Sequence, residues 1–134
     1  MNREATDYWE RARKALATAE TLASLDPDAA ASRAYYAAFD AVCAWLATRG
    51  VTLTRHTAVE AAVHRDLVKA GLWAVELGAD FSFVRGLRWQ GDYGGSFHVD
   101  EATAREGVEA AARVVAAVEA LLPSEAQPDP EKPT

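Results

Sequence analysis

Residues 25–50 read LDPDAAASRAYYAAFDAVCAWLATRG and carry the clearest helix pattern in the chain. Asp26 is a suitable N-cap, Pro27 falls at the first helical position, and Gly50 stands where a left-handed C-terminal residue is common. Between these signals, apolar residues recur at spacings that place them on one helix face. The expected core stripe consists of Ala31, Tyr35, Phe39, Val42 or Cys43, and Leu46.

Helices are predicted on both sides of this stretch. The first covers Thr6 to Leu25, where apolar residues again recur every three or four positions. The next follows the short connection VTLTRH, with Thr54 or His56 as its cap, and runs to about Ala70, where Gly71 offers a stop. These two helices and the one between them give the first half of the chain a regular helical pattern.

The second half contains two more predicted helices. Residues 72–90 favour a helix that is either continuous or broken, because Gly78 and Gly86 weaken the pattern. Asp100 precedes a long helix over residues 101–122. Its inward positions are Val108, Ala111, Val115, Val118 and Leu122.

Length and composition set the fold class. The chain has 134 residues, half of them hydrophobic and 9% aromatic, and alanine dominates the apolar set. This composition favours one domain of closely packed helices. We expect an all-α, up-and-down bundle of four to five helices over residues 1–122. Residues 123–134 carry four of the five prolines and no large apolar side chain, which predicts a disordered acidic tail.

Charge and cysteine content exclude several classes of protein. The net charge is −6, so any nucleic-acid binding has to be local. Cys43 is the one cysteine, and no segment resembles a signal peptide or a membrane span, which predicts a cytoplasmic protein without a membrane partner. The histidines, His56, His64 and His98, include no pair at metal-ligand spacing. We therefore expect no metal site and no cofactor.

The string SRAYYAAFD, residues 32–40, places polar side chains on one helix face. Arg33, Tyr36 and Asp40 stand at i, i+3 and i+7, beside the stripe that contains Tyr35 and Phe39. One interpretation is an aromatic core pair flanked by solvated charges. The other is one wall of a ligand groove.

The string RGLRWQGDYGG, residues 85–95, combines cations with aromatic rings. Arg85 and Arg88 beside Trp89 and Tyr93 suit a phosphate and a stacked base. A structural interpretation is also open. In it, Arg88 and Asp92 form an i, i+4 ion pair, Tyr93 packs at the end of the bundle, and the glycine pair turns the chain.

These two strings, in this order, resemble the HEPN family. Small HEPN proteins have an Arg-Ala-Tyr-Tyr helix, a glycine, a basic-His step, another helix, an Arg-to-Asp-Tyr segment and a long final helix. The corresponding pieces here are Arg33 to Phe39, Gly50, Arg55-His56, Arg88 to Tyr93, and Glu101 to Leu122. The resemblance covers nearly all of the chain except the tail.

The resemblance implies a helical bundle that forms a homodimer and, in many bacteria, a pair with a minimal nucleotidyltransferase. Some family members are toxins that cleave RNA without a metal, through an Arg-x4-6-His motif brought together across the dimer. In such a site an arginine stabilises charge on the phosphorus while an imidazole moves the proton of the attacking hydroxyl. By analogy, Tyr93 is the position at which a partner enzyme would attach a nucleotide.

The chain departs from that motif because the histidine is missing. Four residues, the last of them Asp92, stand between Arg88 and Tyr93, and His98 lies outside the usual spacing. An exposed aspartate is ionised at pH 7 and donates a proton poorly. His56, beside Arg55 at a predicted helix start, is either a helper in anion binding or a surface residue.

The favoured prediction is a dimeric protein that binds RNA or nucleotide and belongs to a toxin–antitoxin or defence pair with a nucleotidyltransferase. The predicted ligand-binding residues are Arg85, Arg88, Tyr93, Arg33, Tyr36 and Asp40. One alternative is a metal-independent endoribonuclease that uses Arg88 with Asp92 or His98. Another is a structural module that binds a protein partner.

Overall fold

The computed structural model describes residues 1–123, and its regular elements are all helical. No strand occurs within these residues, so the predicted all-α fold class is correct. The short element η1 is a π-helical turn that continues α3. The elements are α1 Arg3–Leu22, α2 Pro27–Thr48, α3 His56–Ala62, η1 Val63–Val68, α4 Val75–Tyr93 and α5 Glu101–Glu119.

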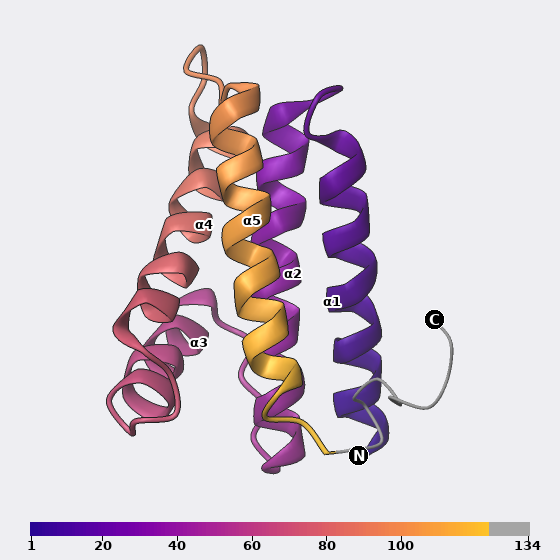
Figure 1. The fold of residues 1–134 in the computed structure, drawn as a ribbon, viewed down its shortest axis with the longest axis vertical. Coiled ribbons are helices and arrows are strands. Elements are labelled where there is room, and N and C mark those ends of the chain that lie inside the picture. Colours follow the sequence, from indigo (N-terminus) through magenta and orange to yellow (C-terminus); the bar gives the residue numbers. More distant parts are fainter. Residues whose placement is uncertain (124–134) are drawn as a thin grey trace.

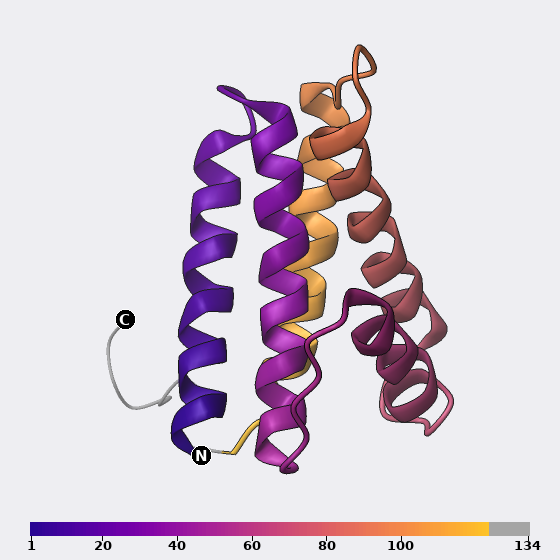
Figure 2. The ribbon, with the colours of Figure 1, turned by 180° about the vertical axis from the view of Figure 1, so that it is seen from behind.

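Helix α2 occupies the centre of the bundle. It packs against α1, α4 and α5, and these long helices run roughly along one axis in an up-and-down arrangement (Figure 1). The short pair α3 and η1 lies beside one end of α4 and joins it to α2, as the view from behind shows (Figure 2). The predicted bundle architecture is confirmed.

The central position of α2 follows from its small side chains. Ala37 and Ala44 are completely buried on one side of the helix, and Ala31, with Tyr35 and Val42, is completely buried on another. A helix packs against neighbours on several sides only when its side chains allow close approach of the axes. The predicted stripe from Ala31 to Leu46 is buried throughout, and so are the five inward positions predicted for α5.

Three residues predicted to mark helix ends, Asp26, Asp100 and Gly50, are confirmed in that role. The Asp26 carboxylate accepts a hydrogen bond from the amide of Ala29 at 3.1 Å, and Asp100 accepts one from Thr103 at 2.7 Å. Gly50 has φ of 74°, the left-handed conformation expected after α2. These caps satisfy backbone groups that the helices themselves leave unpaired.

Several predicted boundaries are wrong. Helix α1 ends at Leu22 rather than Leu25, α4 covers Val75–Tyr93 rather than residues 72–90, and α5 ends at Glu119 rather than at residue 122. Helix α1 begins at Arg3 rather than Thr6, because the Asn2 side chain accepts a hydrogen bond from Ala5 and caps the helix earlier. Neither Thr54 nor His56 caps α3: the N-cap residue is Arg55, and its side chain makes no capping bond. Cap residues are poorly specified when tertiary contacts hold the first turn in place.

Helix α4 is continuous, so of the two forms predicted for residues 72–90 the unbroken one is correct. Gly78 lies inside the helix because of packing: a β-carbon there would come within 2.9 Å of Val68 and 3.2 Å of His64. The glycine thus lets η1 approach α4 closely. Gly71, with φ of 84°, ends the preceding segment as predicted.

Other predictions concern absent features. No helix in residues 1–123 is long and apolar enough to cross a membrane. The same part of the chain contains no cluster of three or more His, Cys, Asp or Glu side chains that could hold a metal ion. Residues 124–134, nearly all of the predicted tail, lie outside the described residues.

Candidate ligand-binding site

A buried tyrosine on α2 fixes the position of His56. Tyr35 is completely buried, and its hydroxyl lies 2.6 Å from Nδ1 of His56. The imidazole also packs against the ring of Phe39, with centroids 4.8 Å apart. Tyr35 of the central helix and His56, the first residue of α3, are therefore held together.

The hydrogen-bond pattern assigns the tautomer of this histidine. Burial raises the pKa of Tyr35, so the phenol keeps its proton, and within the described part of the chain Nδ1 is its hydrogen-bond partner. Tyr35 therefore donates to Nδ1, which leaves the proton of the neutral ring on Nε2. Burial, followed by the charges of Arg88 and Arg85, lowers the pKa of His56. At pH 7 the ring is a neutral donor.

Arg88 projects from α4 into the tyrosines of α2. Its Nη2 donates to the Tyr36 hydroxyl at 3.3 Å, and its guanidinium carbon lies 5.6 Å from the Tyr36 ring and 5.4 Å from the Tyr93 ring. The predicted ion pair with Asp92 is present, with Nε 3.0 Å from Oδ2. That pair is electrostatic only, because Nε is buried and its N–H is not aligned on an acceptor.

Arg85 is paired with a carboxylate from α3. Its Nη1 contacts Oε1 of Glu60, whose other oxygen accepts a hydrogen bond from Ser82 at 3.1 Å. His64 in turn lies 3.2 Å from the Ser82 hydroxyl. The charge of Arg85 is thus compensated within the protein, whereas Arg88 is surrounded mainly by neutral aromatic groups.

These side chains line a cavity of about 520 Å³ between α3 and α4, which we call the α3–α4 cavity. At its edge Trp89 is 64% exposed and stacks on Tyr93, which is 57% exposed, with ring centroids 4.8 Å apart. Tyr93 is the last residue of α4 and contacts Trp89 and Arg88 there, with more than half of its side chain exposed. The cavity is lined by His56, Glu60, Ser82, Arg85, Gly86, Arg88 and Trp89.

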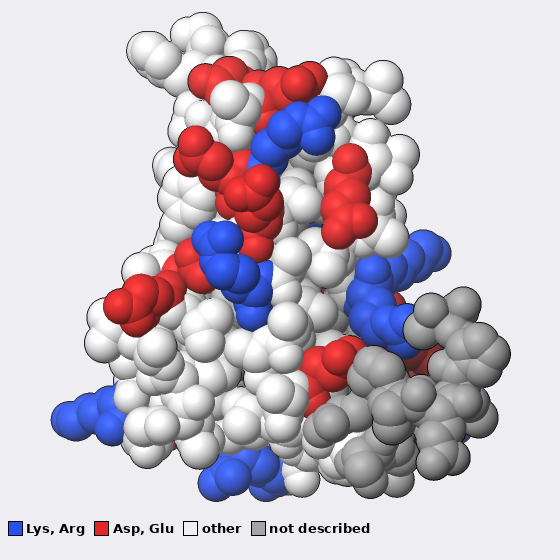
Figure 3. Space-filling view, in the orientation of Figure 1, with Lys and Arg blue, Asp and Glu red and all other residues white. Residues whose placement is uncertain are grey.

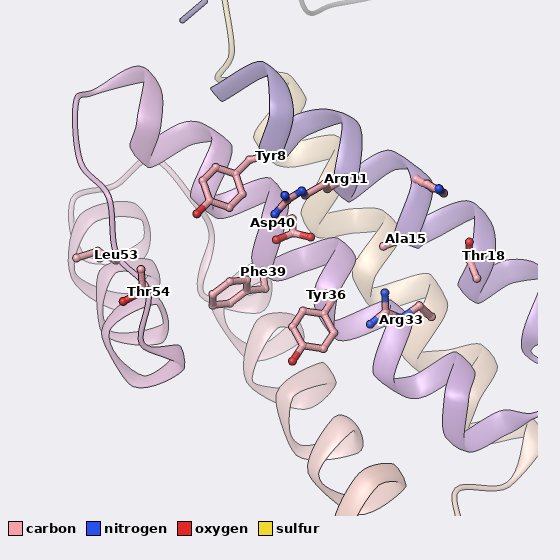
Figure 4. Close-up of a pocket in the computed structure, with 11 residues that line it drawn as sticks. Tyr8, Arg11, Ala15, Thr18, Arg33, Tyr36, Phe39, Asp40, Leu53 and Thr54 are labelled. Carbon is pink, nitrogen blue, oxygen red and sulfur yellow. The ribbon is translucent and has the colours of Figure 1, made fainter. Parts of the chain in front are cut away.

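A second cavity, of about 600 Å³, lies between α1, α2 and the connection after α2 (Figure 4). We call it the α1–α2 cavity. Arg33, Tyr36 and Asp40 line it together, as their spacing on one helix face predicts. The Arg33 guanidinium lies over the Tyr36 ring at 5.0 Å. Tyr36 thus contacts Arg33 in this cavity and Arg88 from the other one.

Comparison with known proteins identifies the family of this chain. The family model of the HEPN domain matches residues 5–121. The chain belongs to the HEPN family. A curated relative, a UPF0332 protein of Thermotoga maritima, is 33% identical over 118 residues, which cover 87% of this chain and 89% of that protein. The resemblance predicted from the sequence is confirmed.

The geometry of this HEPN protein divides the residues predicted to form one groove. Arg85 and Arg88 line the α3–α4 cavity with Tyr93 at its rim, while Arg33 and Asp40 line the α1–α2 cavity. The contact of Arg88 with Tyr36 joins the two sets. The six residues therefore do not line a single groove.

Asp92 and His98, the two side chains predicted as alternatives to a histidine, each have a partner within the protein. Asp92 pairs with Arg88, and Nδ1 of His98 lies 2.6 Å from Asp28 at the start of α2. Asp28 also accepts a hydrogen bond from the amide of Val99 at 2.7 Å. His98 therefore anchors the connection between α4 and α5 to the first turn of α2.

Some residues of the two cavities escaped prediction from the sequence. Glu60 and Ser82 in one cavity, and Tyr8, Arg11 and Lys14 in the other, belong to amphipathic helices whose polar positions look like ordinary solvated faces. A weak signal existed for Arg11 and Lys14, because they share one face of α1. On the face of the molecule drawn in Figure 3, acidic and basic side chains are interspersed.

Proposed function

We propose that this protein binds RNA or a nucleotide at the α3–α4 cavity, as the dimeric member of a toxin–antitoxin or defence pair with a nucleotidyltransferase. One observation carries the proposal. The Arg88 guanidinium, on a side chain that is 19% exposed, is held among the rings of Tyr35, Tyr36 and Tyr93.

The chemistry of the cavity suits a phosphate next to a base. Arg88 provides a planar cation held among aromatic rings, and His56, whose neutral ring carries its proton on Nε2, lines the same cavity. The exposed Trp89–Tyr93 pair provides a surface on which a base stacks. Together these groups bind the backbone and one base of a single strand.

The proposed partners are supported by membership of the family and by the surface near the end of α4. Trp89, Tyr93 and Phe97 are all more than half exposed within 9 residues of each other. Exposed aromatic groups of this kind mark contact surfaces for a second protein or a nucleic acid. The test for dimerisation is sedimentation of the wild-type protein and of a Phe97→Ser variant.

RNA binding is tested by fluorescence anisotropy with a labelled single-stranded RNA at low salt. Arg88→Ala is expected to weaken binding by about 10-fold or more. Arg113→Ala is the matched control, since Arg113 on α5 pairs with Asp80 at 2.9 Å and lines neither cavity. Equal RNA and ATP binding by wild-type protein and an Arg85→Ala/Arg88→Ala variant would contradict the proposal, because it would place the binding site outside the α3–α4 cavity. No binding of RNA or ATP by wild-type protein would leave the protein-interaction module as the function.

A second candidate function is a metal-independent endoribonuclease. The observation in its favour is that an imidazole, His56, lines the same cavity as Arg85 and Arg88 although it comes from another part of the chain. The test is cleavage of total RNA in EDTA. Activity that disappears in Arg88→Ala would support the enzyme, and loss of activity in His56→Ala, Asp92→Asn or His98→Ala would identify the proton-transfer group.

A further inference from the structure

The α1–α2 cavity has an unusual arrangement of charge. Arg11 and Lys14 from α1 and Arg33 from α2 line it with one carboxylate, Asp40. Among residues 1–123, none of these four side chains forms an ion pair, although Figure 4 shows Arg11 projecting from α1 towards Asp40. The charged side chains that line the cavity sum to about +2 in a protein whose net charge is −6, and Asp7 and Glu10 lie beside Arg11 and Lys14 on the adjoining surface.

The interior of the same cavity is apolar and aromatic. Phe39 and Ala15 are buried in its wall, and Leu53 closes the side formed by the connection after α2. Tyr8 and Tyr36 add rings that carry hydroxyl groups, on either side of Asp40 (Figure 4). A volume of about 600 Å³ is in the range of small-molecule sites.

A ligand that complements this cavity has three parts. It has an anionic group for Arg11, Lys14 and Arg33, a flat body for the aromatic wall, and N–H donors for the Asp40 carboxylate, which has no hydrogen-bond partner among the described residues. A nucleoside monophosphate has all three. Its phosphate is a dianion, which balances the local charge of the cavity.

The carboxylate selects among the bases. Guanine presents two adjacent N–H groups, on N1 and N2, that fit the two oxygens of one carboxylate. Adenine and cytosine present one amino group and place an acceptor beside it, which a carboxylate repels. The geometry points to a guanine nucleotide in the α1–α2 cavity, with Asp40 on the base edge and Arg11, Lys14 and Arg33 around the phosphate.

This second site does not depend on RNA binding at the α3–α4 cavity. Arg88 lines only that other cavity, and Asp40 lines only this one. The two meet at Tyr36, whose hydroxyl accepts a hydrogen bond from Arg88. A variant at each position therefore separates the two binding events.

The experiment is calorimetric titration of the full chain with 5′-GMP and, separately, 5′-AMP. Wild-type protein is expected to prefer GMP by about 10-fold or more, the discrimination typical of a bidentate contact to a base edge. Asp40→Asn is expected to remove the preference, and Arg11→Ala to weaken both nucleotides alike. Arg88→Ala is the control, with GMP binding unchanged while RNA binding falls.

The acidity of Asp40 gives a readout that needs no variant. Burial raises the pKa of its carboxyl to about 6, against the opposing charges of Arg11 and Arg33. The other titratable groups that face it are Lys14 and Tyr8 on α1 and Tyr36 and Cys43 on α2, and burial raises the pKa of Tyr8 and of Cys43. The ratio of the affinity for GMP to the affinity for AMP should therefore decrease as the pH is lowered through 6. The phosphates of the two nucleotides titrate alike, so their protonation does not change this ratio.

Three results would overturn the assignment. Equal affinity for GMP and AMP shows that the cavity binds a phosphate alone. No heat with either nucleotide at two temperatures shows that it binds neither, because a binding enthalpy that is zero at one temperature differs from zero at another. Loss of GMP binding in Arg88→Ala, with normal binding in Asp40→Asn, shows that the nucleotide occupies the α3–α4 cavity, which would leave the proposed RNA site standing.

Discussion

The hydroxyl of Tyr35 donates a hydrogen bond of 2.6 Å to Nδ1 of His56, which joins the centre of α2 to the first turn of α3. Tyr35→Phe removes this donor and leaves a half-buried nitrogen unpaired. We expect the free energy of unfolding to fall by about 1 kcal/mol. Because the bond stabilises the neutral ring, the pKa of His56 should rise, which an NMR titration measures.

Tyr36→Phe is the control for this change, since Tyr36 bonds to Arg88 and not to the histidine. Its effect on the pKa of His56 should be small. A fall in that pKa in Tyr35→Phe would show that Nδ1 carries the proton and donates to the phenol.

Replacement of two glycines of α4 by alanine should have opposite effects on the stability of the fold. A β-carbon at Gly91 would lie 2.9 Å from the backbone oxygen of Asp28, whereas one at Gly86 would meet nothing within 4 Å. Gly91→Ala should therefore destabilise the fold by about 1–3 kcal/mol, since the backbone of α2 has to move. Gly86→Ala should stabilise it by about 0.5–1 kcal/mol through helix propensity. Urea denaturation measures both, and each variant controls for the other.

Asp40 should destabilise the folded protein at neutral pH. Its pKa is raised by burial to about 6 in the folded state from an ordinary 3.8, so the folded state holds a proton between these values that the unfolded state lacks. The penalty is present above pH 6 and disappears as the pH falls towards 4. Asp40→Asn should be more stable than wild type by about 1–2 kcal/mol at pH 7, a figure reduced for partial exposure to water.

At pH 4 the two proteins should have equal stability. Asp100→Asn is the comparison with the opposite pH dependence. The amide of Thr103 lowers the pKa of Asp100, so any stabilisation from the charge of Asp100 should be lost as the pH falls. A pH-independent difference between Asp40→Asn and wild type would contradict the assignment of the burial penalty to Asp40.

The thiol of Cys43 should be inert in the native protein. The side chain is buried, and burial raises the pKa of the thiol to about 12. Only the thiolate reacts with a disulfide reagent. Absorbance with such a reagent should show no titration in buffer and one thiol per chain in denaturant, and rapid labelling in buffer would reveal local opening of α2.

Removal of the Asp92 charge should strengthen RNA binding. Asp92 lies 3.0 Å from Nε of Arg88 and competes with a phosphate for that cation. Asp92→Asn is expected to raise affinity several-fold at low salt, with a smaller effect at high salt where charges are screened. An unchanged affinity, measured by the same anisotropy assay as for Arg88→Ala, would place the RNA away from this ion pair.

The helices themselves could be predicted because their signals are local. Asp26, Pro27 and Gly50 lie at the ends of α2, and each signal acts within one turn of the residue that carries it. The spacing of Arg33, Tyr36 and Asp40 also fixed their common face before any tertiary structure was known. The order of the pieces was enough to predict the HEPN family.

The pairing of residues from different helices depended on the tertiary structure. The sequence places His56 21 positions from Tyr35, and Arg88 52 positions from Tyr36, without any sign that they meet. Their contacts depend on how α3 and α4 pack on α2, which is decided by close packing of many small side chains at once. For the same reason, one predicted groove became two cavities that meet at Tyr36. The sequence by itself determined which faces carry chemistry, and only the packing of the helices decided which faces meet.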